Sequence, residues 1–125
     1  MKSEMIILFT FIFILSLLFP LFTQAPDTMW TRTYGGTDYD YGRSVQQTLD
    51  GGYIIVGMTS SFGAGLYDIW LIKTNAQGDL LWTKTYGGTE WDAGRSVQQT
   101  SDEGFIIAGE TWSYGGPVNS FCWSF

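Results

Sequence analysis

The residues best suited to chemistry in this sequence are acidic side chains in two glycine-containing loops. One loop reads Asp38-x-Asp40-x-Gly42, and the second reads Glu90-x-Asp92-x-Gly94. Carboxylates at alternate positions are typical of the start of a calcium-binding loop, because calcium takes six to eight oxygen ligands. Aspartate in loops also accepts backbone N–H bonds and fixes turns. The sequence therefore leaves two interpretations: a calcium site at Asp38, Asp40, Glu90 and Asp92, or a structural turn fixed by Asp40 and Asp92.

Several kinds of chemistry are excluded by composition. The chain has no histidine and one cysteine, Cys122. Zinc sites built from Cys and His, and catalysis by a histidine base, are therefore absent. No pair of a nucleophile and a base recurs in the sequence. We expect no enzymatic activity, no catalytic residues and no cofactor apart from the calcium considered above.

The two loops belong to a repeat with a step of 52 residues. Residues 30–63 and 82–115 are identical at 23 of 34 positions. A period of this length is typical of repeat architectures. We assign the first repeat to residues 30–81 and the second to residues 82–125, with a linker at residues 26–29.

Each repeat is expected to contain four short β-strands and no helix. Segments rich in β-branched and aromatic residues predict strands at 30–34, 44–48, 53–59 and 68–74, after which 80–86 begins the cycle again. The strand at 53–59 is the most apolar, and we expect it to be the most buried. Asp50-Gly51 predicts a tight hairpin turn, because glycine readily adopts positive φ. Four antiparallel strands per period predict an all-β fold of propeller-type blades, and a β-solenoid is the alternative.

The second repeat departs from the first after Gly115. In the 52-residue register, Trp70 corresponds to Cys122 and Leu71 corresponds to Trp123. We interpret this end as degenerate, truncated or frame-shifted. A closing strand of deliberately different sequence is the alternative.

Aromatic residues recur at the strand ends. Trp30 and Trp82 are equivalent, and such recurring aromatics usually pack between neighbouring sheets, although exposed ones can stack on sugar rings. Trp91 and Trp112 are different, because the first repeat has Tyr39 and Ser60 at those positions. Trp91 and Trp112 are therefore the candidate ligand contacts.

Residues 1–25 have the composition of a targeting segment. Lys2 precedes an uncharged run over residues 5–22, and small residues follow at 23–25. This pattern predicts a signal peptide and a secreted or cell-surface protein. The apolar run is long for a signal and close to the length of a membrane span, so an N-terminal membrane anchor is the alternative.

The repeated motif W-T-x-T-Y-G-G-T-x-x-D-x-G-R-S-V-Q-Q-T-x-D-x-G-[YF]-I-I-x-G-x-T resembles a family of tandem β-propeller repeats in secreted and surface proteins of bacteria and archaea. The resemblance covers Trp30 to about Gly116. It implies propeller architecture and export, and it implies no particular activity. Such proteins normally carry enough repeats to close a ring, whereas this chain has about two, so the expected ring is incomplete.

The expected partners follow from charge and from the incomplete ring. The net charge of −6 makes nucleic acid a poor partner. Missing blades could come from a longer parent protein or from about three or four copies of the chain, which would supply about six to eight blades. The first functional hypothesis is a non-enzymatic structural or protein-interaction module. The alternative is a module that binds carbohydrate, such as a surface glycan, or another ligand.

Overall fold

The computed structural model of this chain describes residues 29–115 and 119–124. The expected targeting segment, residues 26–28 of the linker, and residues 116–118 and 125 of the divergent end lie outside the described residues. In the described part of the chain, no helix has the length and apolar character needed to cross a membrane. Its strands are β1 (Asp40–Gln47), β2 (Tyr53–Thr59), β3 (Asp68–Thr74), β4 (Leu80–Tyr86), β5 (Asp92–Gln99), β6 (Phe105–Thr111) and β7 (Asn119–Ser124).

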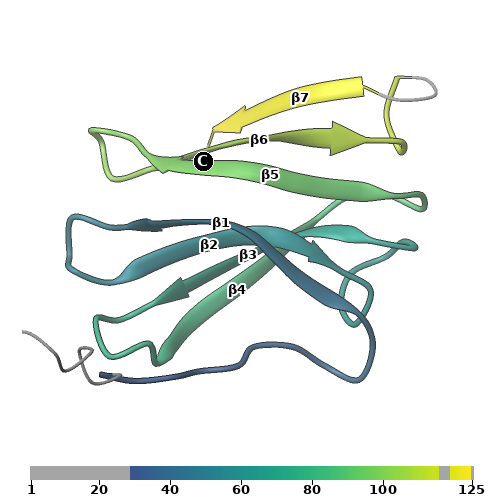
Figure 1. Ribbon diagram of the computed structural model, residues 1–125. Helices are drawn as coiled ribbons and strands as arrows, with labels where there is room; N and C mark the ends of the chain where they lie inside the picture. The colour runs from purple at the N-terminus through teal and green to yellow at the C-terminus, as the bar shows by residue number, and fades with distance from the viewer. Residues whose placement is uncertain (1–28, 116–118, 125) are drawn as a thin grey trace, which may run out of the picture.

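The strands form two antiparallel sheets that stack face to face (Figure 1). The first sheet has the order β1-β2-β3-β4, and the second has the order β5-β6-β7. Asp40 pairs with Thr59 in the first sheet, and Asp92 pairs with Thr111 in the second. These pairs are 52 residues apart, so β5-β6 is a structural copy of β1-β2. The all-β prediction and the absence of helices in the described residues are confirmed.

The predicted strand limits are confirmed in most of the chain. The strands predicted at 53–59, 68–74 and 80–86 have the limits of β2, β3 and β4. β1 begins at Asp40, earlier than the predicted residue 44, because a bulge between Gly42 and Ser44 lets the preceding loop join the ladder.

The prediction of a strand at residues 30–34 is wrong. A strand needs a neighbour for its backbone hydrogen bonds, and no described strand pairs with this segment. Its equivalent 52 residues later is β4, which pairs with β3. The first sheet therefore takes its fourth strand from the start of the second repeat, while residues 29–36 run along the far side of the first sheet (Figure 1).

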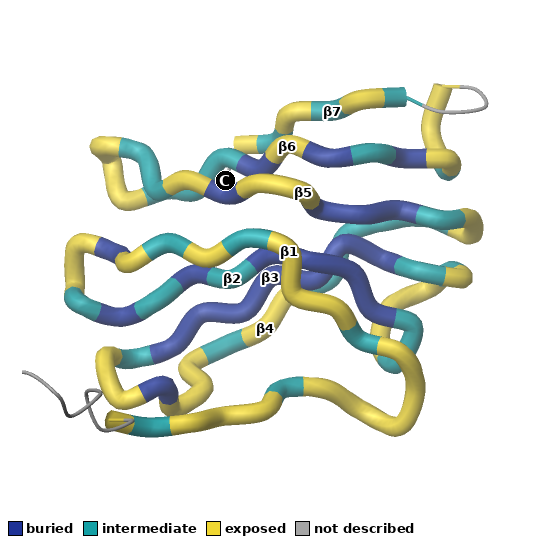
Figure 2. The backbone as a smooth tube through the Cα atoms, in the orientation of Figure 1, coloured by how far each residue is buried: buried dark blue, intermediate teal, exposed yellow. Residues whose placement is uncertain are grey.

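β3 is the most buried strand, so the expectation that residues 53–59 would be the most buried is also wrong. Every residue of β3 is buried, whereas Tyr53 and Ile55 of β2 are half-buried. β3 lies between β2 and β4 in the sheet, and the second sheet covers one of its faces (Figure 2). The burial of β3 depends on its position in the sheet, and this position cannot be read from how apolar the strand is.

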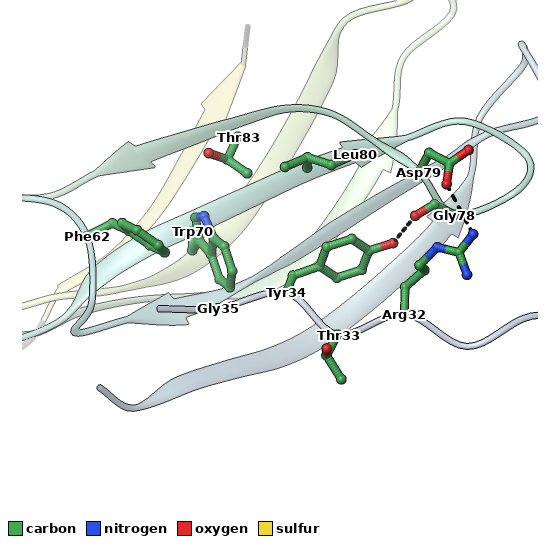
Figure 3. A pocket seen from close by; sticks show the side chains of 10 residues that line it. All are labelled: Arg32, Thr33, Tyr34, Gly35, Phe62, Trp70, Gly78, Asp79, Leu80 and Thr83. Carbon is green, nitrogen blue, oxygen red and sulfur yellow. Dashed lines mark hydrogen bonds and ion pairs between the residues drawn. The ribbon is translucent and has the colours of Figure 1, made fainter. Parts of the chain in front are cut away.

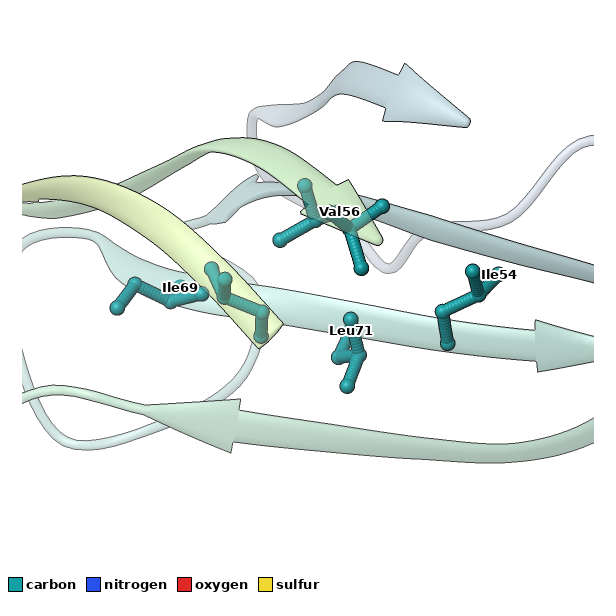
Figure 4. Packing of buried hydrophobic residues seen from close by; sticks show 6 residues of the cluster. Ile54, Val56, Ile69 and Leu71 are labelled. Carbon is teal, nitrogen blue, oxygen red and sulfur yellow. The ribbon is translucent and has the colours of Figure 1, made fainter. Parts of the chain in front are cut away.

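The core lies in the interface between the two sheets. Figure 4 shows Ile54, Val56, Ile69 and Leu71, which the first sheet contributes to this interface. The second sheet contributes Val97 and Ile107. We call this contact the inner interface. Partly buried aromatic side chains pack around it: Trp82, Tyr86, Phe105, Phe121 and Trp123.

Equivalent valines show what the stacking does. Val97 of β5 is 4% exposed, because the first sheet covers it. Val45 of β1 is its equivalent 52 residues earlier and is 63% exposed. Val45 lies on the face of the first sheet that points away from the inner interface. We call this face the open face of the first sheet. Identical residues in nearly identical strands therefore differ in burial because, in the described part of the structure, only Val97 has a sheet in front of it.

The last strand is displaced by one residue from the sequence register. Gly109 pairs with Phe121 as Gly57 pairs with Trp70, and Ala108 pairs with Cys122 as Val56 pairs with Leu71. The correspondence of Trp70 with Cys122 and of Leu71 with Trp123 is therefore wrong. The connection before β7 is one residue shorter than the connection before β3. A one-residue shift moves every side chain to the other face of a strand, so Cys122 occupies the place of Leu71.

The β5–β6 hairpin offers a stabilising substitution. Glu103 has φ of 67°, and its equivalent in the first hairpin is Gly51 with φ of 81°. This left-handed conformation costs a residue with a Cβ about 1–2 kcal/mol, part of which glycine gives back as entropy of the unfolded chain. We expect Glu103→Gly to raise the free energy of unfolding by about 0.5–1 kcal/mol, measured by urea denaturation. The reverse change, Gly51→Glu, should lower it, and equal stability in both variants would contradict this explanation.

Candidate functional site

The loop aspartates hold the turns that precede β1 and β5. One oxygen of Asp92 accepts a hydrogen bond from Thr111 Oγ1, and the other accepts bonds from Ser113 Oγ (2.6 Å) and Gly88 N (2.9 Å). Asp40 makes the equivalent contacts with Thr59, Ser61 and Gly36 N. The interpretation that these aspartates accept backbone N–H bonds and fix the turn is confirmed.

The glycine pair in the repeated YGGT motif is explained by this turn. A Cβ on Gly87 would lie 2.7 Å from Asp92 Oδ2 and 2.2 Å from Asp68 Oδ1. The next residue, Gly88, donates its N–H to Asp92. Glycine lets the backbone wrap closely around the carboxylate, so the motif builds an aspartate-centred turn.

These turns make the fold sensitive to acid. Burial alone would raise the pKa of Asp92, but hydrogen bonds from Ser113, Thr111 and Gly88 outweigh burial and hold the pKa below its ordinary value. The pKa of Asp40 is lowered in the same way. A lowered folded-state pKa stabilises the protein above the unfolded value of about 3.9, and this stability is lost as pH falls through the folded-state pKa.

We therefore expect the free energy of unfolding to be steady above about pH 5 and to fall as the pH drops below about 4. Urea denaturation at several pH values measures this dependence. Asp92→Asn should weaken the dependence, because one carboxylate no longer titrates. An unchanged dependence in that variant would show that other groups cause it.

The remaining calcium candidates lie beside these turns. Asp38 Oδ1 accepts a bond from Tyr39 N, and Glu90 N donates to Ser113 Oγ. Among residues 29–115 and 119–124, no three Cys, Asp or Glu side chains are grouped as metal ligands. Both oxygens of Asp40 and Asp92 already accept hydrogen bonds within the chain. Calcium binding at these four residues stays a prediction.

Trp91 and Trp112, the predicted ligand contacts, lie together. Their ring centroids are 6.3 Å apart with the planes at 62°. They line an open pocket of about 460 Å³ together with Leu66, Glu90 and Glu110. Trp112 is 52% exposed, and Trp91 is half-buried. The pocket therefore joins an apolar surface to two carboxylates, a combination suited to binding a small amphipathic ligand.

The backbone explains why these two tryptophans meet. Trp112 N donates to Trp91 O over 2.9 Å, and in the first repeat Ser60 N donates to Tyr39 O over the same distance. The same backbone hydrogen bond therefore joins the equivalent residues in both repeats. Only in the second repeat are both of these residues tryptophan. Leu66 and Glu110 were not predicted from the sequence as residues of this pocket. Glu110 was detectable as a departure from the repeat, because it replaces Met58, whereas Leu66 comes from a loop of the other sheet.

Arg95 contacts two residues that line this pocket, Trp91 and Glu110. Its guanidinium lies 5.6 Å from the centroid of the Trp91 ring and forms an ion pair of 3.0 Å with Glu110. The ion pair is partly exposed, and such pairs contribute little to stability. Its effect is to orient Glu110 and one face of Trp91.

A second pocket lies between the N-terminal segment and the first sheet (Figure 3). Tyr34 donates its hydroxyl to Gly78 O over 2.5 Å, and Arg32 pairs with Asp79 over 3.1 Å. The volume is about 400 Å³, and the lining includes the buried Trp70. Trp70 Nε1 is buried without a hydrogen-bond partner in the structure described. The segment thus covers this face loosely, with specific contacts at one end.

In comparisons with known proteins, no family model and no curated protein sequence matches this chain. Its function is therefore inferred from its own residues and their geometry.

Proposed function

We propose that this chain is a non-enzymatic, exported β-propeller-type module that acts as a structural or protein-interaction surface. The single observation that carries this proposal is the stacking of equivalent sheets through apolar faces, with one equivalent face left open. Val97 and Ile107 are buried in the inner interface, whereas their equivalents Val45 and Ile55 face outward. The open face of the first sheet therefore carries the same residues that bind a neighbouring sheet elsewhere in the chain.

The remaining parts of this proposal follow from composition. The apolar segment at residues 1–25 supports export, and the absence of histidine supports a function without catalysis by a histidine base. The partners of the open face are further blades, supplied by other copies of this chain or by a longer parent protein. On this face Val45 is exposed and its strand neighbour Ile55 is half-buried, and exposed apolar surface marks protein-interaction sites.

Association of the full-length chain tests this proposal. Light scattering over a range of concentrations should detect oligomers, and Val45→Asp should reduce their fraction, because it places a charge on the open face of the first sheet. Leu49→Asp is the matched control, since Leu49 is an exposed residue of the β1–β2 turn. A folded monomer at every concentration, or association that Val45→Asp leaves unchanged, would contradict the proposal.

Carbohydrate binding is the second candidate function, favoured by the pocket at Trp91 and Trp112. Indole rings stack on the apolar faces of sugars, and carboxylates accept hydrogen bonds from their hydroxyl groups. The pocket supplies both, because Glu90 and Glu110 flank the two rings. The two tryptophans occur only in the second repeat, which separates this pocket from the shared architecture of the sheets.

Glycan-array binding by the wild-type chain and by Trp112→Ala tests this candidate. Binding that Trp112→Ala removes would support it, because the exposed Trp112 can be truncated with little effect on folding. Tyr39→Ala is the control, since Tyr39 is the exposed first-repeat equivalent of Trp91. The absence of binding to any glycan would exclude carbohydrate as the ligand.

A further inference from the structure

Within the described residues, the second sheet lacks a counterpart of β4, the fourth strand of the first sheet, and the N-terminal segment repeats the sequence of β4. The first sheet has four strands and the second has three. The strand that completes the first sheet is β4, which reads Leu-Leu-Trp-Thr-Lys-Thr-Tyr, and residues 30–34 read Trp-Thr-Arg-Thr-Tyr. In the described part of the chain, no strand pairs with the outer edge of β7, and no strand pairs with residues 30–34.

The N-terminal segment already has the placement of a fourth strand. Trp82 of β4 packs against Phe105 of the second sheet, with centroids 6.1 Å apart and planes at 64°. Trp30 packs against Tyr53 of the first sheet, with centroids 5.7 Å apart and planes at 63°. These pairs are equivalent in the 52-residue repeat. Residues 30–34 therefore lie against the first sheet in the same way that β4 lies against the second sheet. β4 also pairs with β3 in its own sheet, whereas no described strand pairs with residues 30–34.

We propose that β7 of one copy pairs with residues 30–34 of a second copy, which completes the second sheet between molecules. This inference rests on the proposed function, because it identifies the partner as another copy of this chain and names the contact. Within one molecule, the segment and β7 lie on opposite sides of the stack (Figure 1). Pairing between copies satisfies the open backbone edge of β7, in the manner of strand addition at a sheet edge.

The register of this pairing follows from the first sheet. Leu71 pairs with Lys84, and Ile69 pairs with Tyr86. Cys122 occupies the place of Leu71, and Arg32 is the equivalent of Lys84. In the same register, Cys122 of one copy lies opposite Arg32 of the next. Ser120 lies opposite Tyr34, and Ser124 lies opposite Trp30.

Strand addition also places the open face of the first sheet against the second sheet of the neighbouring copy. The face it covers carries Ala108, Ser120 and Cys122, whereas the inner interface has Val56, Ile69 and Leu71 at those places. The contact between copies buries less apolar surface, so it is weaker than the inner interface. It is a head-to-tail contact, which forms a ring when the rotation between copies closes and a filament when it does not.

The natural cysteine on β7 gives a direct test in the full-length chain. Cys122 is an exposed free cysteine. Residues opposite each other in antiparallel strands have Cα atoms about 4.5–5.5 Å apart, within the range that a disulfide spans. After mild oxidation, Arg32→Cys should form intermolecular disulfides at least about tenfold more than the wild type, seen on a non-reducing gel. Adding Cys122→Ser should remove them.

Lys84→Cys is the matched control, because Lys84 is the repeat equivalent of Arg32 but is already paired inside the first sheet. It should not crosslink to Cys122. Two results would overturn strand addition and leave the proposed interaction surface standing. One is equal crosslinking by Lys84→Cys, and the other is an Arg32→Cys oligomer, detected by light scattering, that forms no disulfide to Cys122. A wild-type chain that does not associate would overturn both proposals. Circular dichroism of each variant establishes that it is folded.

Discussion

Val97→Asp is expected to lower the free energy of unfolding by about 3–5 kcal/mol, because it puts an unpaired charge into the inner interface. Val97 is 4% exposed and belongs to the cluster formed by Ile54, Val56, Ile69, Leu71 and Ile107. The buried residues of this cluster are all apolar, so none can form an ion pair with the new carboxylate. A small domain has a total stability of only about 5–15 kcal/mol, so this loss is a large fraction of the whole.

The repeat supplies the control for this substitution. Val45→Asp introduces the same change at the equivalent residue, which is 63% exposed. In dilute solution, where copies do not associate, it should change the free energy of unfolding by less than about 0.5 kcal/mol. Urea denaturation followed by tryptophan fluorescence measures both variants. Equal losses would show that the two sheets do not stack as described.

Asp92→Ala is expected to cost about 3–5 kcal/mol, because three donors lose their acceptor at once. These donors are Thr111 Oγ1, Ser113 Oγ and Gly88 N. A buried donor without a partner costs about 1–3 kcal/mol. Asp92 has no exposed surface, so water cannot easily replace the carboxylate.

Asp40→Ala is the matched variant for the first repeat. Asp40 accepts the equivalent bonds but is only half-buried. We therefore expect a smaller loss, since water can reach the donors that this substitution leaves. The comparison is made by urea denaturation at neutral pH. A larger loss for Asp40→Ala than for Asp92→Ala would contradict the role assigned to burial.

Much of the fold was predictable because it depends on local patterns. The limits of β2, β3 and β4 follow from apolar runs between turn-forming residues, and positive φ at Gly51 follows from the Asp-Gly turn. The role of Asp40 and Asp92 in fixing turns was one of two interpretations of the loop motif, and their hydrogen bonds show it directly. Each of these features involves residues close together in the chain.

The candidate ligand site was only partly predictable. Trp91 and Trp112 were detectable as departures from the repeat, and the structure brings them together with Glu90. Leu66 joins them from the loop before β3, and no pattern in the sequence relates it to residues of the second sheet. Its approach depends on how the two sheets stack.

The sequence by itself determined the repeat and the strands with strong local patterns, because local backbone preference acts within each copy. It offered the aspartate-centred turns as one of two interpretations of the loop motif. Only the tertiary structure decided which equivalent residues are buried, as Val97 and Val45 show. It also decided that residues 30–34 form no strand while residues 82–86 do. The physical reason is the same in both cases. Burial and strand pairing require a neighbour, and two nearly identical segments have different neighbours.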